Sequence, residues 1–195
     1  MLYMKVKNIY LVICSYILTY YGGKKNEKLE IGQKGGGLKG YIHLDICPGP
    51  GVEIVADMKD IPTKDEYWDK IFSTNTLEHA HWTEVKSCLK EWHRVLKTNG
   101  ELEIVVPNIY GAMYKYVNGL QDISWETLMG YIFCNETYVE CDDDPRKFQQ
   151  LHKSGYSEKY LTEILEETGF SDIEFQGMHK GTGGDLWIKC KKVGK

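Results

Sequence analysis

Residues 28–57 read KLEIGQKGGGLKGYIHLDICPGPGVEIVAD, and they set the architecture that we expect for the whole chain. Three short apolar runs in this segment either alternate with polar residues or are rich in branched residues, as strands are. These runs cover residues 28–31, 41–46 and 52–56. A glycine-dense loop and a Pro-Gly-Pro-Gly turn separate them, and such glycines mark backbone that turns sharply or is approached closely. The segment therefore predicts three consecutive strands with tight connections.

The rest of the chain alternates between strands and helices. Further strands are predicted over residues 71–74, 102–106, 173–176 and 186–190, the last two as a hairpin. A helix is predicted between the first two of these, because apolar residues recur there at three- and four-residue spacing up to a left-handed stop at Asn99-Gly100. A second helix is predicted over residues 158–168, with Ser157 as its N-cap. This order is typical of an α/β protein with a mostly parallel sheet.

Glycine or polar residues stand at the carboxyl ends of the three apolar runs, at Gly32-Gln33, Asp45 and Asp57. In open α/β sheets, ligands bind beyond the carboxyl ends of the strands. For one aspartate alone, a helix cap or a solvated loop is the commoner role. Two aspartates on consecutive strands, just after a glycine loop, favour a ligand site.

Composition narrows the class of protein. The 195 residues are 42% hydrophobic and 27% charged, as in one ordinary globular domain. The net charge of -4 shows no excess of basic residues that would attract a polyanion, so we expect no nucleic-acid partner. None of the six cysteines forms a Cys-x-x-Cys pair or has zinc-ligand spacing with histidine, so we expect reduced thiols, a cytoplasmic protein and no metal.

The amino terminus is predicted to be an apolar extension over residues 1–27. Its apolar run, residues 9–21, is too short for a membrane-spanning helix and lacks a good signal-peptide cleavage site. We therefore expect an additional core element here, with export or membrane anchoring as the alternative. The sequence does not predict an oligomeric state.

Several motifs together resemble class I S-adenosylmethionine-dependent methyltransferases. They are Leu29-Glu30-Ile31-Gly32, Gly40 to Asp45, Val55-Ala56-Asp57, Trp68 to Phe72, Thr76-Leu77-Glu78-His79 and Glu91 to Leu102. The late stretch His152 to Ser157 is similar to one in a subgroup of small predicted methyltransferases, some of them associated with polysaccharide biosynthesis. The resemblance implies a Rossmann-like class I methyltransferase fold over residues 28–195. Such a fold is a three-layer sandwich whose mostly parallel sheet has a C-terminal antiparallel hairpin strand, and residues 108–153 would form a lid-like insertion.

The resemblance also implies S-adenosyl-L-methionine as the cofactor and a set of residues that bind it. The implied set is Glu30, Gly32, Gln33, Asp45, Ile46, Asp57, Met58, Asn75 and Leu77. Asp45 would accept hydrogen bonds from the ribose hydroxyls, which suits an ionised carboxylate. Asp57 and Met58 would border the adenine, and Glu30 and Gly32 would face the methionine end.

Two departures from the family pattern lie in the glycine loop. Lys34 replaces the middle glycine, and Gln33 stands where the subgroup commonly has cysteine. The loop also reaches the next strand too soon for a full-length helix between them. These departures favour an alternative, a catalytically degenerate binding module, whereas Asp45 and Asp57 favour the enzyme. A nicotinamide-dependent oxidoreductase fits less well, because the glycines do not open a helix and no acid follows at the expected spacing.

Histidines are the candidate catalytic residues. Methyl transfer from a sulfonium is an in-line displacement that needs a base only if the acceptor must lose a proton. Our hypothesis is that His79 or His152 is that base, because neutral imidazole titrates nearest to working pH. The alternatives are that His152 braces the 158–168 helix and that His79 holds a loop.

The insertion is rich in aromatic residues and ends near an acidic run, residues 140–144. Aromatic faces and hydroxyls suit planar or polar substrates, so the insertion could cover a small-molecule or glycan-precursor acceptor. An additional helical pair with its own small core explains the same residues equally well.

Overall fold

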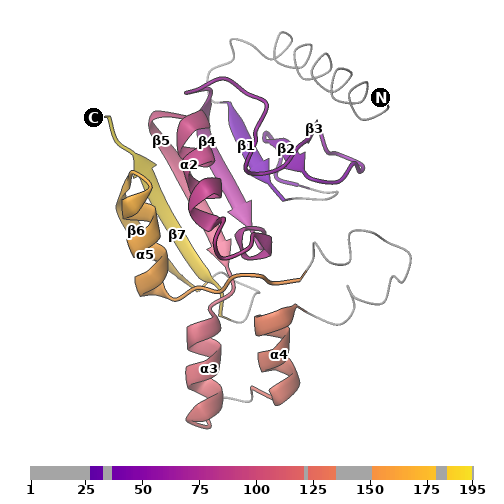
Figure 1. The fold of residues 1–195 in the computed structure, drawn as a ribbon, viewed down its shortest axis with the longest axis vertical. Coiled ribbons are helices and arrows are strands. Elements are labelled where there is room, and N and C mark those ends of the chain that lie inside the picture. Colours follow the sequence, from indigo (N-terminus) through magenta and orange to yellow (C-terminus); the bar gives the residue numbers. More distant parts are fainter. Residues whose placement is uncertain (1–26, 33–36, 121–122, 135–150, 179–183, 195) are drawn as a thin grey trace.

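The computed structural model describes residues 27–32, 37–120, 123–134, 151–178 and 184–194. Its centre is a seven-stranded sheet in the order β3-β2-β1-β4-β5-β7-β6 (Figure 1). The strands are β1 (Lys28–Ile31), β2 (Ile42–Asp45), β3 (Ile54–Val55), β4 (Trp68–Thr74), β5 (Leu96–Val106), β6 (Phe170–Met178) and β7 (Leu186–Lys192). The order reverses beside β1, so the chain returns across the sheet at the place where ligands bind in such folds.

Strand directions confirm the predicted mixture. β1 pairs in parallel with β2 and β4, β3 pairs in parallel with β2, and β5 pairs in parallel with β4. β7 is antiparallel to both of its neighbours, β5 and β6. The fold is therefore the predicted Rossmann-like α/β fold, with one antiparallel strand supplied by the C-terminal hairpin.

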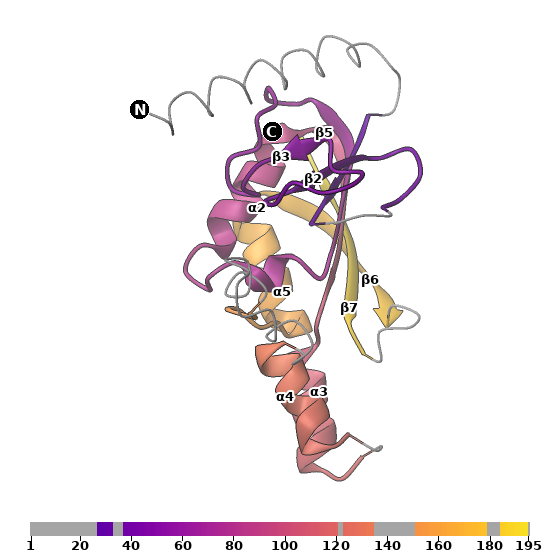
Figure 2. The same cartoon turned by 90° about the vertical axis from the view of Figure 1, so that its right-hand side faces the viewer.

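Two helices cover one face of this sheet, α2 (Val85–Val95) and α5 (Glu158–Glu167) (Figures 1 and 2). The apolar stripe of α2 is fully buried, and Trp92 also donates an indole hydrogen bond to the Met58 carbonyl. Ser157 caps α5 as predicted, its hydroxyl accepting from the Tyr160 amide. α2 ends at Val95, earlier than the predicted stop, because Leu96 is already extended and begins β5.

The opposite face of the sheet carries charged residues that neutralise one another. Lys70 on β4 contacts Glu101 and Glu103 on β5. Glu103 also accepts from the Trp187 indole on β7 at 2.6 Å. The residues that the structure describes place no helix on this face, and so supply two of the three expected layers (Figure 2).

The described part of the insertion is a pair of helices that projects from the carboxyl end of β5. These are α3 (Ile109–Val117) and α4 (Trp125–Phe133), seen at the bottom of Figures 1 and 2. Asn108 and Ser124 cap them through side-chain oxygens. Several large apolar side chains on the pair are exposed: Tyr110, Met113, Tyr114, Tyr116, Val117, Trp125 and Phe133.

Three regions with sequence-based predictions lie outside the described residues: the amino-terminal extension as far as residue 26, the glycine loop at 33–36, and the acidic run at 140–144. Among the helices that the structure describes, none is long and apolar enough to cross a membrane.

Candidate functional site

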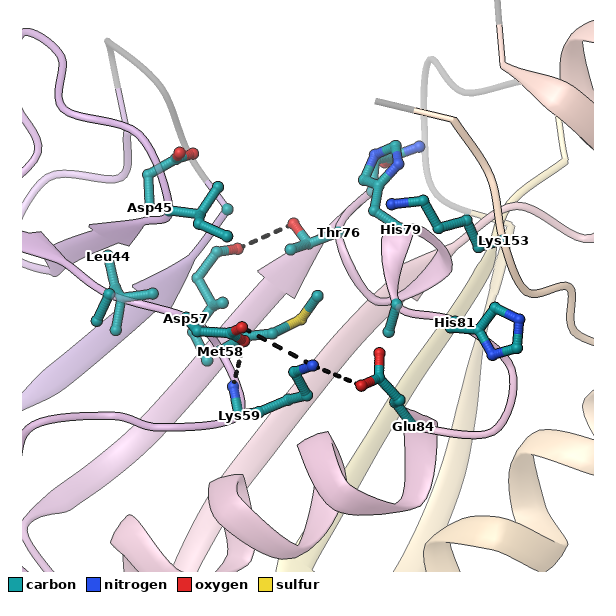
Figure 3. A pocket seen from close by; sticks show the side chains of 16 residues that line it. Leu44, Asp45, Asp57, Met58, Lys59, Thr76, His79, His81, Glu84 and Lys153 are labelled. Carbon is teal, nitrogen blue, oxygen red and sulfur yellow. Dashed lines mark hydrogen bonds and ion pairs between the residues drawn. The ribbon is translucent and has the colours of Figure 1, made fainter. Parts of the chain in front are cut away.

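A cavity of about 440 Å³ lies at the carboxyl ends of β1, β2, β3 and β4 (Figure 3). This volume lies within the range of small-molecule and cofactor sites. Its lining comprises Ile31, Gly32, Leu44, Asp45, Ile46, Ala56, Asp57, Met58, Lys59, Asn75, Thr76, His79, Ala80, His81, Glu84 and Lys153. The cavity therefore lies where the sequence pattern predicted a ligand.

Gly32 and Thr76 join the ends of β1 and β4 at the floor of the cavity. Gly32 has a φ of +86°, and a Cβ added there would lie 1.8 Å from Thr76 Oγ1. The Thr76 hydroxyl donates toward the carbonyls of Ile31 and Thr74, at 3.1 and 2.9 Å. Only glycine fits this conformation and this space, so the backbone itself forms the cavity wall.

The two aspartates stand on neighbouring strand ends of the same cavity. Asp45 is the last residue of β2, and its Oδ1 accepts from the Cys47 amide at 2.8 Å, which holds the carboxylate in a turn. Asp57 follows β3, and its Oδ1 accepts from the Lys59 amide at 2.9 Å. Each carboxylate keeps its second oxygen outside its turn hydrogen bond.

Lys59 bridges two acids of the cavity, Asp57 and Glu84 (Figure 3). Lys59 Nζ lies 2.7 Å from Glu84 Oε1 and 3.8 Å from Asp57 Oδ2. The hydrogen bond to Glu84, followed by the charge of Asp57, raises the pKa of Lys59. Met58 also lines the cavity, close to Asp57 and Lys59, and its thioether gives this charged part of the wall an apolar surface (Figure 3).

A short 3-10 helix, η1 (Leu77–His79), bounds the other end of the cavity. Its Glu78 is 1% exposed, and neither carboxylate oxygen has a hydrogen-bond partner among the described residues. Burial, with a smaller contribution from Asp185, raises the pKa of Glu78 to about 8. Burial also lowers the pKa of His79, whose Nδ1 lies 3.3 Å from the Leu151 carbonyl. His79 is therefore predominantly neutral near pH 7 and faces the cavity.

Residues 151–156 pack directly against η1. His152 Nε2 lies 4.0 Å from Glu78 Oε1, and the His79 and His152 rings are 5.3 Å apart between centroids. The amides of Lys153 and Ser154 both donate to the Glu78 carbonyl. The Lys153 side chain extends into the cavity close to His79 (Figure 3). A distant part of the chain thus completes this end of the site.

Tyr156 anchors residues 151–156 to η1 through its hydroxyl group. Its hydroxyl donates to the Leu77 carbonyl at 3.1 Å and lies 2.8 Å from the Ser154 hydroxyl, in a buried position. Tyr156→Phe removes these bonds while keeping the ring, so we expect the free energy of unfolding to fall by about 1–2 kcal/mol. Urea denaturation would measure the change. Tyr160→Phe is the control, because the Tyr160 ring stacks on Tyr156; an equal loss there would contradict the role given to the Tyr156 hydroxyl.

Most of the predicted site residues that the structure describes do line the cavity. They are Gly32, Asp45, Ile46, Asp57, Met58, Asn75 and His79. His152 does not line it but lies directly behind His79. Gln33 and Lys34 fall outside the described residues.

Two of the predicted cofactor-binding residues, Glu30 and Leu77, do not line the cavity. Glu30 does not line the cavity, because Leu29 and Ile31 face the core and alternation turns Glu30 to the opposite face of the sheet. There its Oε2 accepts from the Leu38 amide at 2.7 Å and lies 2.8 Å from His43 Nδ1. Leu77 is fully buried in the hydrophobic core and does not line the cavity either.

Sequence reasoning missed nine lining residues, of which five are polar: Thr76, Lys59, His81, Glu84 and Lys153. Thr76 and Lys59 directly follow predicted site residues, so their positions carried a usable signal. Glu84 and Lys153 belong to segments that reach the cavity only through the packing of α2 and η1, which no local pattern shows.

Comparison with known proteins agrees with this architecture. Residues 40–104 match the family model described as a methyltransferase domain. Among curated proteins no match is found. A methyltransferase dependent on S-adenosylmethionine from Thermotoga maritima is similar over 97% of this chain and 96% of its own, with a TM-score of 0.54 and 14% identity.

Two further structures share the fold. One from Archaeoglobus fulgidus, also described as a methyltransferase dependent on S-adenosylmethionine, has a TM-score of 0.54 and 17% identity over 95% of this chain and 94% of its own. The 1,6-didemethyltoxoflavin-N1-methyltransferase of Burkholderia thailandensis, solved with bound 1,6-didemethyltoxoflavin and S-adenosylhomocysteine, has a TM-score of 0.55 and 15% identity over 95% of this chain and 79% of its own. The chain thus has the fold of class I S-adenosylmethionine-dependent methyltransferases, and residues 40–104 carry the sequence pattern of the methyltransferase domain family.

Proposed function

We propose that this protein is an S-adenosylmethionine-dependent methyltransferase that acts on a small-molecule or glycan-precursor acceptor. The observation that carries the proposal is one cavity at the strand ends that brings Asp45 and Asp57 together beside the Gly32 bend. The match to the methyltransferase domain supports the same cofactor independently.

The cofactor's adenosine would occupy the end of the cavity formed by β2 and β3. There Asp45 would accept hydrogen bonds from the ribose hydroxyls through the oxygen that its turn leaves available. Asp57 and Met58 would border the adenine, with the thioether covering one face of the ring. The backbone at Gly32 admits the methionine portion, because no side chain projects from it.

The acceptor would enter at the η1 end. In an in-line displacement, the nucleophile of the acceptor must approach the methyl group opposite the sulfur, so the protein contributes mainly position. His79 lines this end, with His152 behind it. We assign these two histidines to activation of the acceptor, since both lie at the η1 end of the cavity, away from the end proposed for the adenosine.

The helix pair α3 and α4, which is rich in aromatic residues, would cover the bound acceptor. It projects from the end of β5, and α4 leads toward the His152 segment: the Tyr131 carbonyl lies 2.9 Å from His152 Nδ1. Aromatic and hydroxyl groups of this kind suit a planar or polar small molecule.

Titration calorimetry with S-adenosylmethionine tests the proposal. We expect a saturable heat for one site per chain, in the micromolar range, and transfer of labelled methyl groups to a component of a metabolite extract. Absence of saturable heat at millimolar cofactor would favour a binding module that keeps the fold without the cofactor. Binding without any transfer would overturn the enzymatic part alone.

A further inference from the structure

We propose that Glu78, His79 and His152 form a binding site for a divalent transition-metal ion, with zinc as the best-suited candidate, at the acceptor end of the cavity. One ring nitrogen from each histidine and one carboxylate oxygen of Glu78 lie within 4.8 Å of one another. The inference rests on the proposed function and deepens it, because the two histidines would then act on the acceptor through the ion and not as free bases, but metal binding itself can be measured without any acceptor or cofactor.

The buried carboxylate is the first observation that points to a cation. Glu78 is 1% exposed, and both of its oxygens lack a hydrogen-bond partner in the described part of the chain. Burying an unpaired carboxylate is costly unless it is paired with a cation, coordinates a metal or becomes protonated. Asp185, itself 4% exposed, lies close enough to add negative potential. Near pH 7 this carboxyl is mostly protonated by itself, and a bound cation would pair with it in its ionised form instead.

The histidines are oriented as metal ligands usually are. His152 Nδ1 lies 2.9 Å from the Tyr131 carbonyl, and His79 Nδ1 lies 3.3 Å from the Leu151 carbonyl. A backbone carbonyl at Nδ1 favours the tautomer with hydrogen on that nitrogen, which in His152 leaves the Nε2 lone pair available. In His152, it is this Nε2 that lies 4.0 Å from Glu78 Oε1.

The donor set selects the class of metal. Two imidazoles and one carboxylate suit zinc and similar first-row ions, whereas magnesium and calcium prefer oxygen ligands alone. Zinc bonds of about 2.0–2.2 Å would place ligand atoms roughly 3.4 Å apart, so the three side chains would close inward by about 1 Å on binding.

Three protein ligands leave a coordination position for a further group. Because His79 also lines the cavity, that position would be near the entering acceptor. The acceptor class that this favours is a molecule with an oxygen ligand, such as a hydroxyl or carboxylate, next to its methylation position.

The test is zinc binding to the full-length protein after treatment with a chelator, measured by competition with a chromophoric zinc indicator. Wild type is expected to bind one zinc ion that Glu78→Gln and His152→Ala each weaken at least 100-fold. Glu78→Gln keeps the shape of the side chain and removes the carboxylate ligand, and because burial keeps Glu78 mostly protonated near pH 7 in the absence of a cation, the variant should fold about as well as wild type. His81→Ala is the matched control, because His81 lies in the same cavity but outside the cluster; its affinity should equal that of wild type.

Cobalt(II) absorption gives a second readout, in which the substituted wild type should show d–d bands that Glu78→Gln lacks. Equal zinc affinity in wild type and Glu78→Gln would mean adventitious binding elsewhere and would overturn the inference, as would the absence of binding in wild type. Titration of S-adenosylhomocysteine into the same samples separates the two proposals. If wild type binds this ligand but no zinc, only the zinc site is refuted. If wild type binds zinc but not this ligand, only the methyltransferase function is refuted.

Discussion

Asp45→Ala is expected to weaken S-adenosylhomocysteine binding about 100-fold. Asp45 ends β2 at the cavity, and one of its oxygens is held by the Cys47 amide. The proposed ribose contacts are two hydrogen bonds to an ionised acceptor, each worth about 1.5–3 kcal/mol. Losing about 3 kcal/mol corresponds to roughly two orders of magnitude in the dissociation constant. Titration calorimetry on both proteins measures the difference.

Two further variants separate the charge of Asp45 from its structural role. Asp45→Asn keeps an oxygen that can accept from the Cys47 amide and removes only the charge, so we expect an intermediate loss of about tenfold. Asp60→Asn is the control, because Asp60 is exposed and does not line the cavity, and it should bind like wild type. If Asp45→Ala bound the ligand as tightly as Asp60→Asn, the ribose role of Asp45 would be wrong.

Gly32→Ala is expected to lower the free energy of unfolding by at least about 3 kcal/mol. An added Cβ would lie 1.8 Å from Thr76 Oγ1 and 2.6 Å from Thr76 Cβ, and the φ of +86° is unfavourable for alanine. A strained backbone conformation costs about 1–3 kcal/mol by itself, and the overlap adds the cost of moving Thr76 away from the carbonyls of Ile31 and Thr74. Urea denaturation measures the sum.

Gly40→Ala is a matched control for the backbone term. Gly40 has nearly the same φ, +87°, but nothing lies within 4 Å of the added Cβ. We expect a loss of only about 1 kcal/mol there. The double variant Gly32→Ala/Thr76→Ala should lose less stability than the sum of its single changes, because Thr76→Ala removes the two closest clashing atoms. Equal losses for Gly32→Ala and Gly40→Ala would show that the contact with Thr76 has no effect.

The sheet was predictable because its signals are local. The first three strands at the cavity are short apolar runs that stop at a glycine or an acid, so the order of residue types alone places Gly32, Asp45 and Asp57 at strand ends. The Ser157 cap was predictable for the same reason, since a hydroxyl directly precedes an amphipathic helix.

Glu30 and Leu77 show that a motif does not by itself place a side chain in the cavity. Both belong to stretches that resemble cofactor-binding motifs, yet their side chains face elsewhere. For Glu30, strand alternation already carried the answer, because its neighbours Leu29 and Ile31 are both core residues. For Leu77 no such period exists in a single turn of 3-10 helix, and the hydrophobic core determines its direction.

The grouping of Glu78 with His152 could not be predicted from sequence. The two residues come from segments far apart in the chain, and their spacing matches no known ligand motif. They meet because Tyr156 and Ser154 hydrogen-bond to carbonyls of η1, and this contact exists only after the fold has formed. The prediction of no metal rested on local spacing alone, and local spacing does not detect side chains that come together only in the fold.

The most direct test of the adenosine site is a crystal structure determined from crystals of the protein soaked with S-adenosylhomocysteine. We predict that both ribose hydroxyls lie within hydrogen-bonding distance of the Asp45 carboxylate, with the adenine between Asp57 and Met58. Ligand density elsewhere on the protein, or ribose hydroxyls that contact neither aspartate, would contradict the site described here.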